Sequence, residues 1–530
     1  MTQLPITGKQ QIGFSESAAG TETFRSTNPQ SGAENPWTFH EATESEIDRA
    51  MEAARAASDS YSCKSGARRA QFLRAIATEL DGMADAIVQA YMAESGLPEG
   101  RARGELGRTT GQLKAFADLV EEGSWIQARI DTAQPDRQPL PRPDIRKCLA
   151  PLGPVVVFGA SNFPLAFSTA GGDTASALAA GCPVVVKGHP MHPATGELVA
   201  RAMVQAARET GMPEGVFSHL QGLSHQLGAK LVTHPHTRAV GFTGSLQGGL
   251  ALARLGQQRH DPIPVFAEMG SINPVVLLPS ALEPTAGWAK AYAHSVTLGT
   301  GQFCTNPGLL IGLQGPALDA FVHDLAGAMA EIPASCMLHA HIAARYRQAR
   351  KELLSQPGVS LVTPDVEPEG PNRVPASVAR VSGADFRANQ RLQEEVFGPF
   401  TLVVGCKDRA ELEALLAGLE GQLTAALIGN EAELSGAQSL VSLLREKAGR
   451  VLFNGVPTGV EVCPSMQHGG PFPATTDARF TSVGTDAILR WARPVAYQNC
   501  PGALLPEALR DENPLGILRL VNGAYTRKPL

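Results

Sequence analysis

Hydrophobic positions recur along this chain at two different spacings. Between residues 67 and 95, apolar residues such as Phe72, Ile76 and Leu80 recur every three or four positions, which predicts one helix that stops at Gly96. Elsewhere, apolar runs of a few residues bounded by Gly, Pro or Asn predict buried strands. The predicted strands are 154–158, 183–186, 238–242, 274–278, 309–313, 360–363, 400–404, 424–428 and 450–453. Further helices are predicted at 112–124, 166–180, 193–210, 246–259, 315–331 and 408–419.

This alternation of strands and helices is typical of mostly parallel sheets covered by helices, so we expect an α/β fold. The strands fall into two groups along the chain, which predicts two α/β units with a boundary near residue 270. Ahead of them, Thr43 and Glu46 form a capping box that predicts the start of a helix. The first forty residues are polar and predict irregular structure, and residues 134–154, rich in Pro and Arg, predict an extended connection.

Composition narrows the range of possible functions. A chain of 530 residues suggests roughly two to four domains. Its net charge of -6 gives no electrostatic reason to expect nucleic acid or an anionic membrane surface as a partner. No apolar stretch approaches the ~20 residues that a membrane helix needs, and the first residues lack the pattern of a signal peptide. We therefore expect a cytoplasmic protein that acts on a small molecule.

One cysteine lies in a setting that suits chemistry. The eight cysteines are scattered, form no CxxC pair and have no zinc-ligand spacing, so we expect reduced thiols and no metal. Cys304 lies in the segment GQFCTNPG, among turn-forming residues, and Glu268 lies in FAEMG, 36 positions earlier. A nucleophilic thiol and a carboxylate together suit covalent acyl chemistry. The alternative is that Cys304, like most cysteines, is a small packing residue.

Four further segments follow or precede predicted strands, where ligands of parallel sheets bind. Asn162 in SNFP could donate a hydrogen bond to an oxyanion, or it could only stabilise a turn. Lys187, at the end of a strand, could reach a cofactor hydroxyl or simply be solvated. Gly244 and Ser245 precede a helix whose N-terminus could hold a pyrophosphate, although glycines also make tight turns. Glu395 in EEVFGP could hold a ribose hydroxyl or lie on the surface.

The order of these segments in one chain resembles the aldehyde dehydrogenase superfamily over roughly residues 20–500, with GQFCT and EEVFGP as its specific signatures. The resemblance implies that Cys304 attacks an aldehyde, that Asn162 stabilises the oxyanion, and that Glu268 activates the water that hydrolyses the thioester. It also implies a group of residues that bind the cofactor. These are Lys187, His189, Gly244, Ser245, Glu395 and Phe397.

The same resemblance implies a division into domains. A Rossmann-like NAD(P)-binding domain would comprise residues 15–135 and 151–269, and an α/β catalytic domain would comprise residues 270–465. A small β arm, 136–150 and 484–500, would provide strands for a homodimer or homotetramer.

Several segments depart from the common family pattern and indicate a branch. GQFCTNPG, KGHP and HGGPFPATTDARFTSVG resemble the dehydrogenases of α-ketoglutarate semialdehyde (2,5-dioxopentanoate), with long-chain aldehyde dehydrogenases as near relatives. The expected reaction is therefore oxidation of 2,5-dioxopentanoate to 2-oxoglutarate, and the alternative is oxidation of medium or long aliphatic aldehydes. A thiol hydrolase would leave Lys187, the FTGS loop and EEVFGP unexplained. A non-catalytic scaffold predicts decay of the active-site set, whereas Cys304, Glu268 and Asn162 are all present.

Cofactor and substrate preferences depend on a few positions. Many NAD-dependent members carry a glutamate three residues after the strand-end lysine, where it repels a 2′-phosphate. Here that position is Pro190, so we expect NADP to be accepted and preferred over NAD. Arg103 and Arg108 are candidates for binding a substrate carboxylate, or are surface residues of a helix. His468 is a further candidate for the substrate site, or stabilises a turn.

Overall fold

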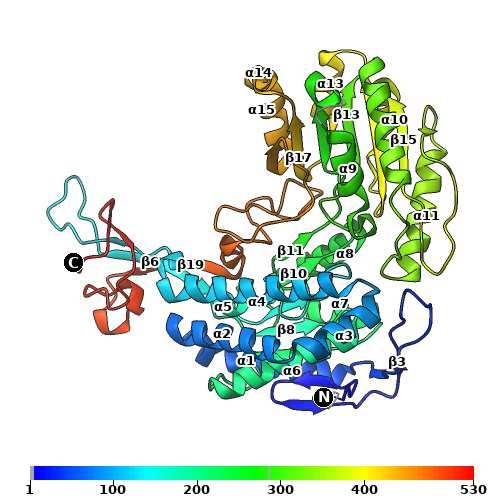
Figure 1. Cartoon of the computed structure of the whole chain (residues 1–530). Coiled ribbons are helices and arrows are strands. Elements are labelled where there is room, and N and C mark those ends of the chain that lie inside the picture. The colour runs from blue at the N-terminus through cyan, green and yellow to red at the C-terminus, as the bar shows by residue number, and fades with distance from the viewer. Residues whose placement is uncertain (1–4, 284–286) are drawn as a thin grey trace.

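Two α/β lobes and a smaller sheet that projects away from them make up the fold (Figure 1). The computed structural model describes residues 5–283 and 287–530. The α/β class predicted from the hydrophobic pattern is confirmed, and every predicted strand is present with small shifts at its ends. Within the described ranges, no helix is long and apolar enough to cross a membrane.

The first lobe is built on a seven-stranded sheet in the order β11-β10-β7-β8-β9-β1-β2. Strands β7 to β11 are parallel, whereas β1 pairs antiparallel with β9 and β2. The strands are β1 (Gln10–Ile12), β2 (Ser15–Ser17), β7 (Val155–Phe158), β8 (Val184–Lys187), β9 (Phe217–Leu220), β10 (Ala239–Thr243) and β11 (Val265–Glu268). The helices are α1 (Glu44–Ser62), α2 (Gly66–Gly82), α3 (Ala84–Ser95), α4 (Glu99–Glu122), α5 (Gly172–Ala180), α6 (Pro193–Glu209), α7 (His225–Thr233) and α8 (Leu246–Gln257).

The second lobe is built on another seven-stranded sheet, in the order β14-β15-β16-β13-β12-β17-β18, parallel except for β14. Its strands are β12 (Pro274–Leu277), β13 (Leu309–Leu313), β14 (Ser360–Leu361), β15 (Ser377–Ser382), β16 (Phe400–Cys406), β17 (Gln422–Ile428) and β18 (Ala448–Phe453). Its helices are α9 (Trp288–Thr297), α10 (Pro316–Ala330), α11 (Ala340–Leu354), α12 (Gly383–Ala388), α13 (Arg409–Gly418), α14 (Glu431–Ser435) and α15 (Gln438–Lys447). The chain passes from the first sheet to the second between β11 and β12.

The projecting sheet joins segments that are distant in the sequence. Its order is β19-β6-β5-β20-β21, and β6 pairs antiparallel with β19 along seven residues. The strands are β5 (Arg129–Asp131), β6 (Ile145–Pro151), β19 (Ala492–Gln498), β20 (Arg519–Val521) and β21 (Ala524–Thr526). Strands β5, β20 and β21 were not predicted, because each has only three residues and no clear apolar run.

Three helix predictions need correction. The single helix predicted for 67–95 is two helices, because the chain breaks at Met83, whose N–H bonds back to Glu79 and Leu80 after the weak helix former Gly82. The helix predicted for 112–124 is α4, which begins at Glu99; four glycines between Glu99 and Gln112 hid the pattern. The helix predicted to begin at 166 begins at Gly172.

The prediction at the N-terminal end was partly right. The capping box at Thr43 and Glu46 is confirmed, with both reciprocal hydrogen bonds formed. The first forty residues are not wholly irregular, because β1 and β2 extend the first sheet and β3 (Thr23–Phe24) pairs with β4 (Phe39–His40).

Candidate active site

The carboxyl ends of the parallel strands of the first lobe gather several predicted site residues at one edge of the sheet. Lys187 ends β8, Glu268 ends β11, and Asn162 follows β7. Ser245 follows β10 and caps α8, where its hydroxyl accepts a hydrogen bond from the N–H of Gly248 at 3.2 Å. The helix therefore presents its N-terminus at the same edge, as an anion-binding site requires.

A cavity of about 1000 Å³ lies along this edge. It is large for a ligand site and has room for a dinucleotide. Residues of both lobes line it. They include Asn162, Lys187, His189, Pro190, Gly244, Ser245, Glu268, Cys304, Glu395 and Phe397. Every cofactor-binding residue expected from the sequence thus faces one space, and that space ends at the cysteine.

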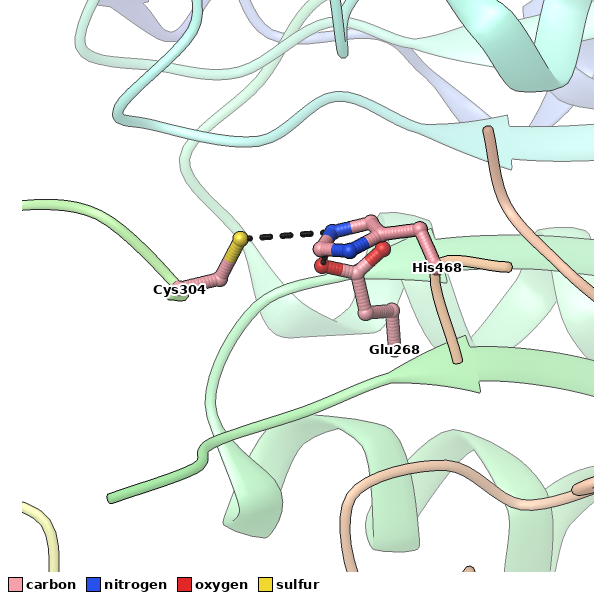
Figure 2. A group of neighbouring side chains, drawn as sticks. All are labelled: Glu268, Cys304 and His468. Atoms are coloured by element: carbon pink, nitrogen blue, oxygen red, sulfur yellow. Dashed lines mark hydrogen bonds and ion pairs between the residues drawn. The ribbon is translucent and has the colours of Figure 1, made fainter. Parts of the chain in front are cut away.

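Cys304 and Glu268, which line the cavity, meet a third side chain, that of His468 (Figure 2). Nε2 of His468 lies 3.4 Å from Sγ of Cys304 and 2.9 Å from Oε1 of Glu268. Both His468 and Glu268 are almost completely buried. The placement of His468 differs from the expectation of a substrate-binding residue, because it contacts the thiol and the carboxylate directly.

No spacing rule could have found this trio, because its members are far apart in the sequence. Their possible ligand atoms all lie within 4.8 Å of one another, a separation at which a metal ion could also bind. No metal was predicted from the sequence, because the cysteines lack zinc-ligand spacing along the chain. The fold creates the cluster from β11, the Cys304 turn and the loop that follows β18.

The turn before Cys304 is held by a close backbone approach. Gly301 has φ 65°, and a Cβ atom there would lie 2.2 Å from the carbonyl carbon of Gly398. The Asn306 amide donates to the carbonyl of the same Gly398 at 3.1 Å. Because the GQFC and EEVFGP segments are packed against each other this closely, only glycine can occupy position 301.

Asn162 points toward the same turn. Its Nδ2 donates to the carbonyl of Gln302 at 3.0 Å. An amide nitrogen carries two N–H groups, so one donor remains for a ligand. Asn273 Nδ2 in turn donates to the carbonyl of Cys304 at 2.8 Å, which holds the cysteine backbone in place.

Burial and nearby charge control the protonation of the thiol and the carboxylate. Burial, followed by the negative charge of Glu268, raises the pKa of Cys304 well above its ordinary value. Burial alone would raise the pKa of Glu268, but the charge of His468 and hydrogen bonds from His468, Ser482 and Cys304 outweigh it, and the pKa is lowered. The pair therefore consists of a thiol and a carboxylate, which is the state a base needs before it accepts the thiol proton.

Two buried groups on the cofactor side also have shifted pKa values. Burial lowers the pKa of Lys187 to about 8, and its Nζ donates to the carbonyl of Gly222 at 2.7 Å. Burial raises the pKa of Glu395 to about 7. Each side chain has more hydrogen-bonding positions than these contacts use, and hydroxyl groups of a bound ribose could occupy them. These residues therefore fit a nucleotide cofactor.

The environment of His189 suits a neutral side chain. Its ring stacks on His192 with centroids 5.2 Å apart, and burial, followed by the charge of His192, lowers its pKa well below the ordinary value. No carboxylate stands at position 190, where Pro190 lines the cavity.

The two candidate arginines of α4 occupy different places. Arg103 is exposed and forms ion pairs with Glu99 and Asp85 on the surface, so its candidacy for the substrate site is not supported. Arg108 points inward, with its guanidinium 5.5 Å from the centre of the Phe167 ring. That ring lies 6.2 Å from the ring of His468. Arg108 therefore lies one side chain away from the trio.

All eight cysteines are unpaired. Cys148, Cys182 and Cys406 are buried packing residues, and burial raises the pKa of each thiol. Cys63 is exposed, so it does not fit the expectation of a packing residue.

Such a fold and site define a class of protein, a two-lobed α/β enzyme that pairs a dinucleotide-sized cavity with a cysteine in contact with a histidine and a carboxylate. Residues 14–471 match the aldehyde dehydrogenase family. The chain belongs to that family.

Two relatives are similar over almost the whole chain. The alpha-ketoglutaric semialdehyde dehydrogenase 2 of Azospirillum brasilense is 49% identical, over 98% of this chain and 99% of the relative. The alpha-ketoglutaric semialdehyde dehydrogenase of Acinetobacter baylyi is 47% identical, with the same coverage of each chain.

Solved structures support the same fold at lower identity. The betaine aldehyde dehydrogenase of Staphylococcus aureus has a TM-score of 0.80 at 19% identity, covering 94% of this chain and 97% of that one. The 1-pyrroline-5-carboxylate dehydrogenase of Thermus thermophilus has a TM-score of 0.78 at 22% identity, covering 93% and 92%.

Proposed function

We propose that this protein oxidises 2,5-dioxopentanoate to 2-oxoglutarate with NAD(P), through a thioester on Cys304. The observation that carries the proposal is that Cys304 and Glu268 line a dinucleotide-sized cavity and that both are in contact with His468. The choice of substrate rests on the 47–49% identity to two relatives that are named for this semialdehyde.

The first step requires a thiolate. Because the Cys304 thiol has a raised pKa, it holds its proton until a base takes it, and Glu268 is the carboxylate in contact with it. His468 lies between the two groups and stabilises the charged form of the carboxylate. The Cys304 sulfur then bonds to the aldehyde carbon. The free N–H of Asn162 and the backbone N–H of Cys304 stabilise the resulting oxyanion.

The second step removes a hydride from the tetrahedral carbon and leaves a thioester on Cys304. A bound nicotinamide would supply the hydride acceptor. Lys187 and Glu395 would hold the two riboses, the N-terminus of α8 at Ser245 would hold the pyrophosphate, and Phe397 would pack near the ring. NADP is the proposed preference, because position 190 carries no carboxylate to repel a 2′-phosphate.

The last step hydrolyses the thioester. Glu268 first releases the proton of the thiol to solvent and then takes a proton from water as the water oxygen bonds to the acyl carbon. The bond between carbon and sulfur breaks, the carboxylic acid leaves, and Cys304 departs as a thiolate that regains its proton from Glu268. Ser482 donates a hydrogen bond to the second oxygen of Glu268 and orients the carboxylate. A base next to the acyl carbon typically accelerates such a step about 10²- to 10⁴-fold.

We also propose that the first lobe binds the cofactor, that the second lobe carries the nucleophile, and that the projecting sheet mediates a homodimer or homotetramer. Large apolar side chains on the projecting segments support the last point. Leu140, Leu504 and Tyr525 are 69%, 72% and 70% exposed. Exposed apolar side chains that gather in one part of a molecule mark an interaction surface.

The test compares kcat/KM for 2,5-dioxopentanoate and for hexanal, each with NADP and with NAD, by the absorbance of the reduced nicotinamide. A strong preference for the dicarbonyl acid supports the proposal. A preference for hexanal would move the protein to the aliphatic branch and overturn the choice of substrate while leaving the thioester chemistry intact.

A further inference from the structure

Two arginines near the trio are placed alike. Arg108 comes from α4 in the first lobe, and Arg450 comes from β18 in the second lobe. Both are half-buried, and neither forms an ion pair with a carboxylate of the described residues. Arg450 was not among the predicted site residues, because an arginine inside a strand is usually a solvated surface residue.

One loop holds both guanidinium groups. Arg108 Nη1 donates to the carbonyl of Val460 at 2.8 Å. Arg450 donates from Nη2 to the carbonyl of Pro457 at 2.7 Å and from Nη1 to that of Gly459 at 3.2 Å. Residues 457–460 therefore bring a cation from each lobe to the same short segment.

The pair lies beside the reacting groups. Arg108 is over Phe167, whose ring faces His468. Arg450 Nη1 lies 4.0 Å from Sδ of Met466, two residues before His468. The residue next to Arg450, Gly449, packs against the backbone of Gly469, since a Cβ atom there would lie 2.0 Å from the Gly469 carbonyl oxygen.

Donors remain unused on both side chains. Nε and Nη2 of Arg108 and Nε of Arg450 are buried and have no hydrogen-bond partner. Burial lowers the pKa of each guanidinium, and the Cys304 side chain is among the groups whose charge acts on both. Glu105 and Glu461 also act on Arg108 through their charges, but neither forms an ion pair with it. A buried guanidinium with unpaired donors is unfavourable, and a bound anion would relieve this.

Glu105, the nearest carboxylate on α4, is already occupied. Its Oε1 accepts from the backbone N–H groups of Leu165 and Ala166, and its Oε2 accepts from Tyr91 and Arg101. It therefore anchors the loop after Asn162 and leaves the unused donors of Arg108 without a partner.

We propose that Arg108 and Arg450 together bind the carboxylate of the substrate, at the end of the molecule opposite the aldehyde. This inference rests on the proposed function and deepens it by naming the residues that select an acid. A planar carboxylate matches the forked donors of arginine. The aromatic rings of Phe163, Phe167 and Phe303 form a cluster that contacts His468 through Phe167, and such an apolar surface suits the short carbon chain between the two ends.

The experiment measures kcat/KM for 2,5-dioxopentanoate and for pentanal, which has as many carbons and no carboxylate. The variants are Arg108→Gln, Arg450→Gln and Arg450→Lys, with Arg103→Gln as the control from the exposed face of α4. We expect each Gln variant to lower the ratio of acid to pentanal kcat/KM on the order of 10- to 100-fold, mainly through KM. Arg450→Lys keeps the positive charge, so it should lower this ratio less than Arg450→Gln does.

Inhibition by glutarate, a five-carbon dicarboxylate, gives a second readout, and its inhibition constant should rise in the same variants. If Arg450→Gln does not fold, the Arg450→Lys and Arg108→Gln enzymes still decide the matter by these two measurements. This inference alone would be overturned if the wild-type enzyme prefers the acid but the folded variants keep its ratio of acid to pentanal kcat/KM and its inhibition constant for glutarate. A wild-type enzyme that prefers hexanal would instead overturn the proposed substrate.

Discussion

Replacing His468 with phenylalanine tests the contact at the centre of the site. Phenylalanine has a similar volume and fills the buried space, but it removes the nitrogen that lies 2.9 Å from Oε1 of Glu268. The variant therefore leaves a buried carboxylate that has lost its pairing with His468 and retains its interactions with Ser482 and Cys304.

The size of the effect follows from the lost interaction. A hydrogen bond to a charged group contributes about 1.5–3 kcal/mol, and its loss corresponds to a roughly 10- to 150-fold change in an equilibrium. In the wild-type protein the charge and hydrogen bond of His468 help to lower the pKa of Glu268, against burial. Without them burial prevails, the carboxyl group stays protonated to higher pH, and less base is available. The acid limb of kcat/KM should therefore move to higher pH.

The assay is the pH profile of kcat/KM between about pH 5 and 9, followed by reduced nicotinamide. His468→Gln, which retains an N–H donor, should recover part of the loss. Ser482→Ala should move the acid limb in the same direction, because it removes the bond to the other oxygen. A His468→Phe enzyme with the wild-type acid limb and rate would refute the reasoning, since Glu268 would then not depend on this contact.

Four further predictions concern the same site. Cys304→Ala should abolish aldehyde oxidation, and substantial residual turnover would exclude it as the nucleophile. Glu268→Gln should slow both the deprotonation of the thiol and the release of the thioester, so the steady-state rate should fall; an unchanged steady-state rate would remove Glu268 as the general base. Pro190→Glu should shift the ratio of NADP to NAD kcat/KM toward NAD by repelling the 2′-phosphate, and an unaltered ratio would show that discrimination lies elsewhere. Treatment with EDTA should leave turnover unchanged, whereas a loss that Zn²⁺ restores would reveal a metal at the trio.

The pattern of apolar residues along the chain predicted those strands and helices that can be recognised from adjacent residues in the sequence. The strands were found because apolar runs such as 154–158 and 309–313 are buried on both faces of parallel sheets and need no partner to be recognised. The helix break at Met83 was missed because the apolar positions continue through it. The start of α4 was missed because Gly100 and Gly104 lower helix propensity, although their missing side chains face open space.

The site residues also separate into those that the sequence predicts and those that it does not. Cys304 and Glu268 lie in segments whose residue types indicate a chemical role, and the structure brings the two residues together. His468 and Arg450 derive their positions from long-range packing of the loop after β18, which no local pattern encodes. His468, in the HGGPFP loop, was predicted either to line the substrate site or to stabilise a turn, and its contact with Cys304 and Glu268 was not predicted.

The approach of Gly301 to Gly398 has a consequence for how this enzyme could change. The first glycine belongs to the turn that positions the nucleophile, and the second belongs to the segment that contains Glu395. Because the two backbones touch, the distance between the sulfur and the proposed ribose-binding carboxylate is set by main-chain contact and not by replaceable side chains. Selection for a new cofactor or a new aldehyde would have to act on the cavity walls, since neither segment can shift without moving the other.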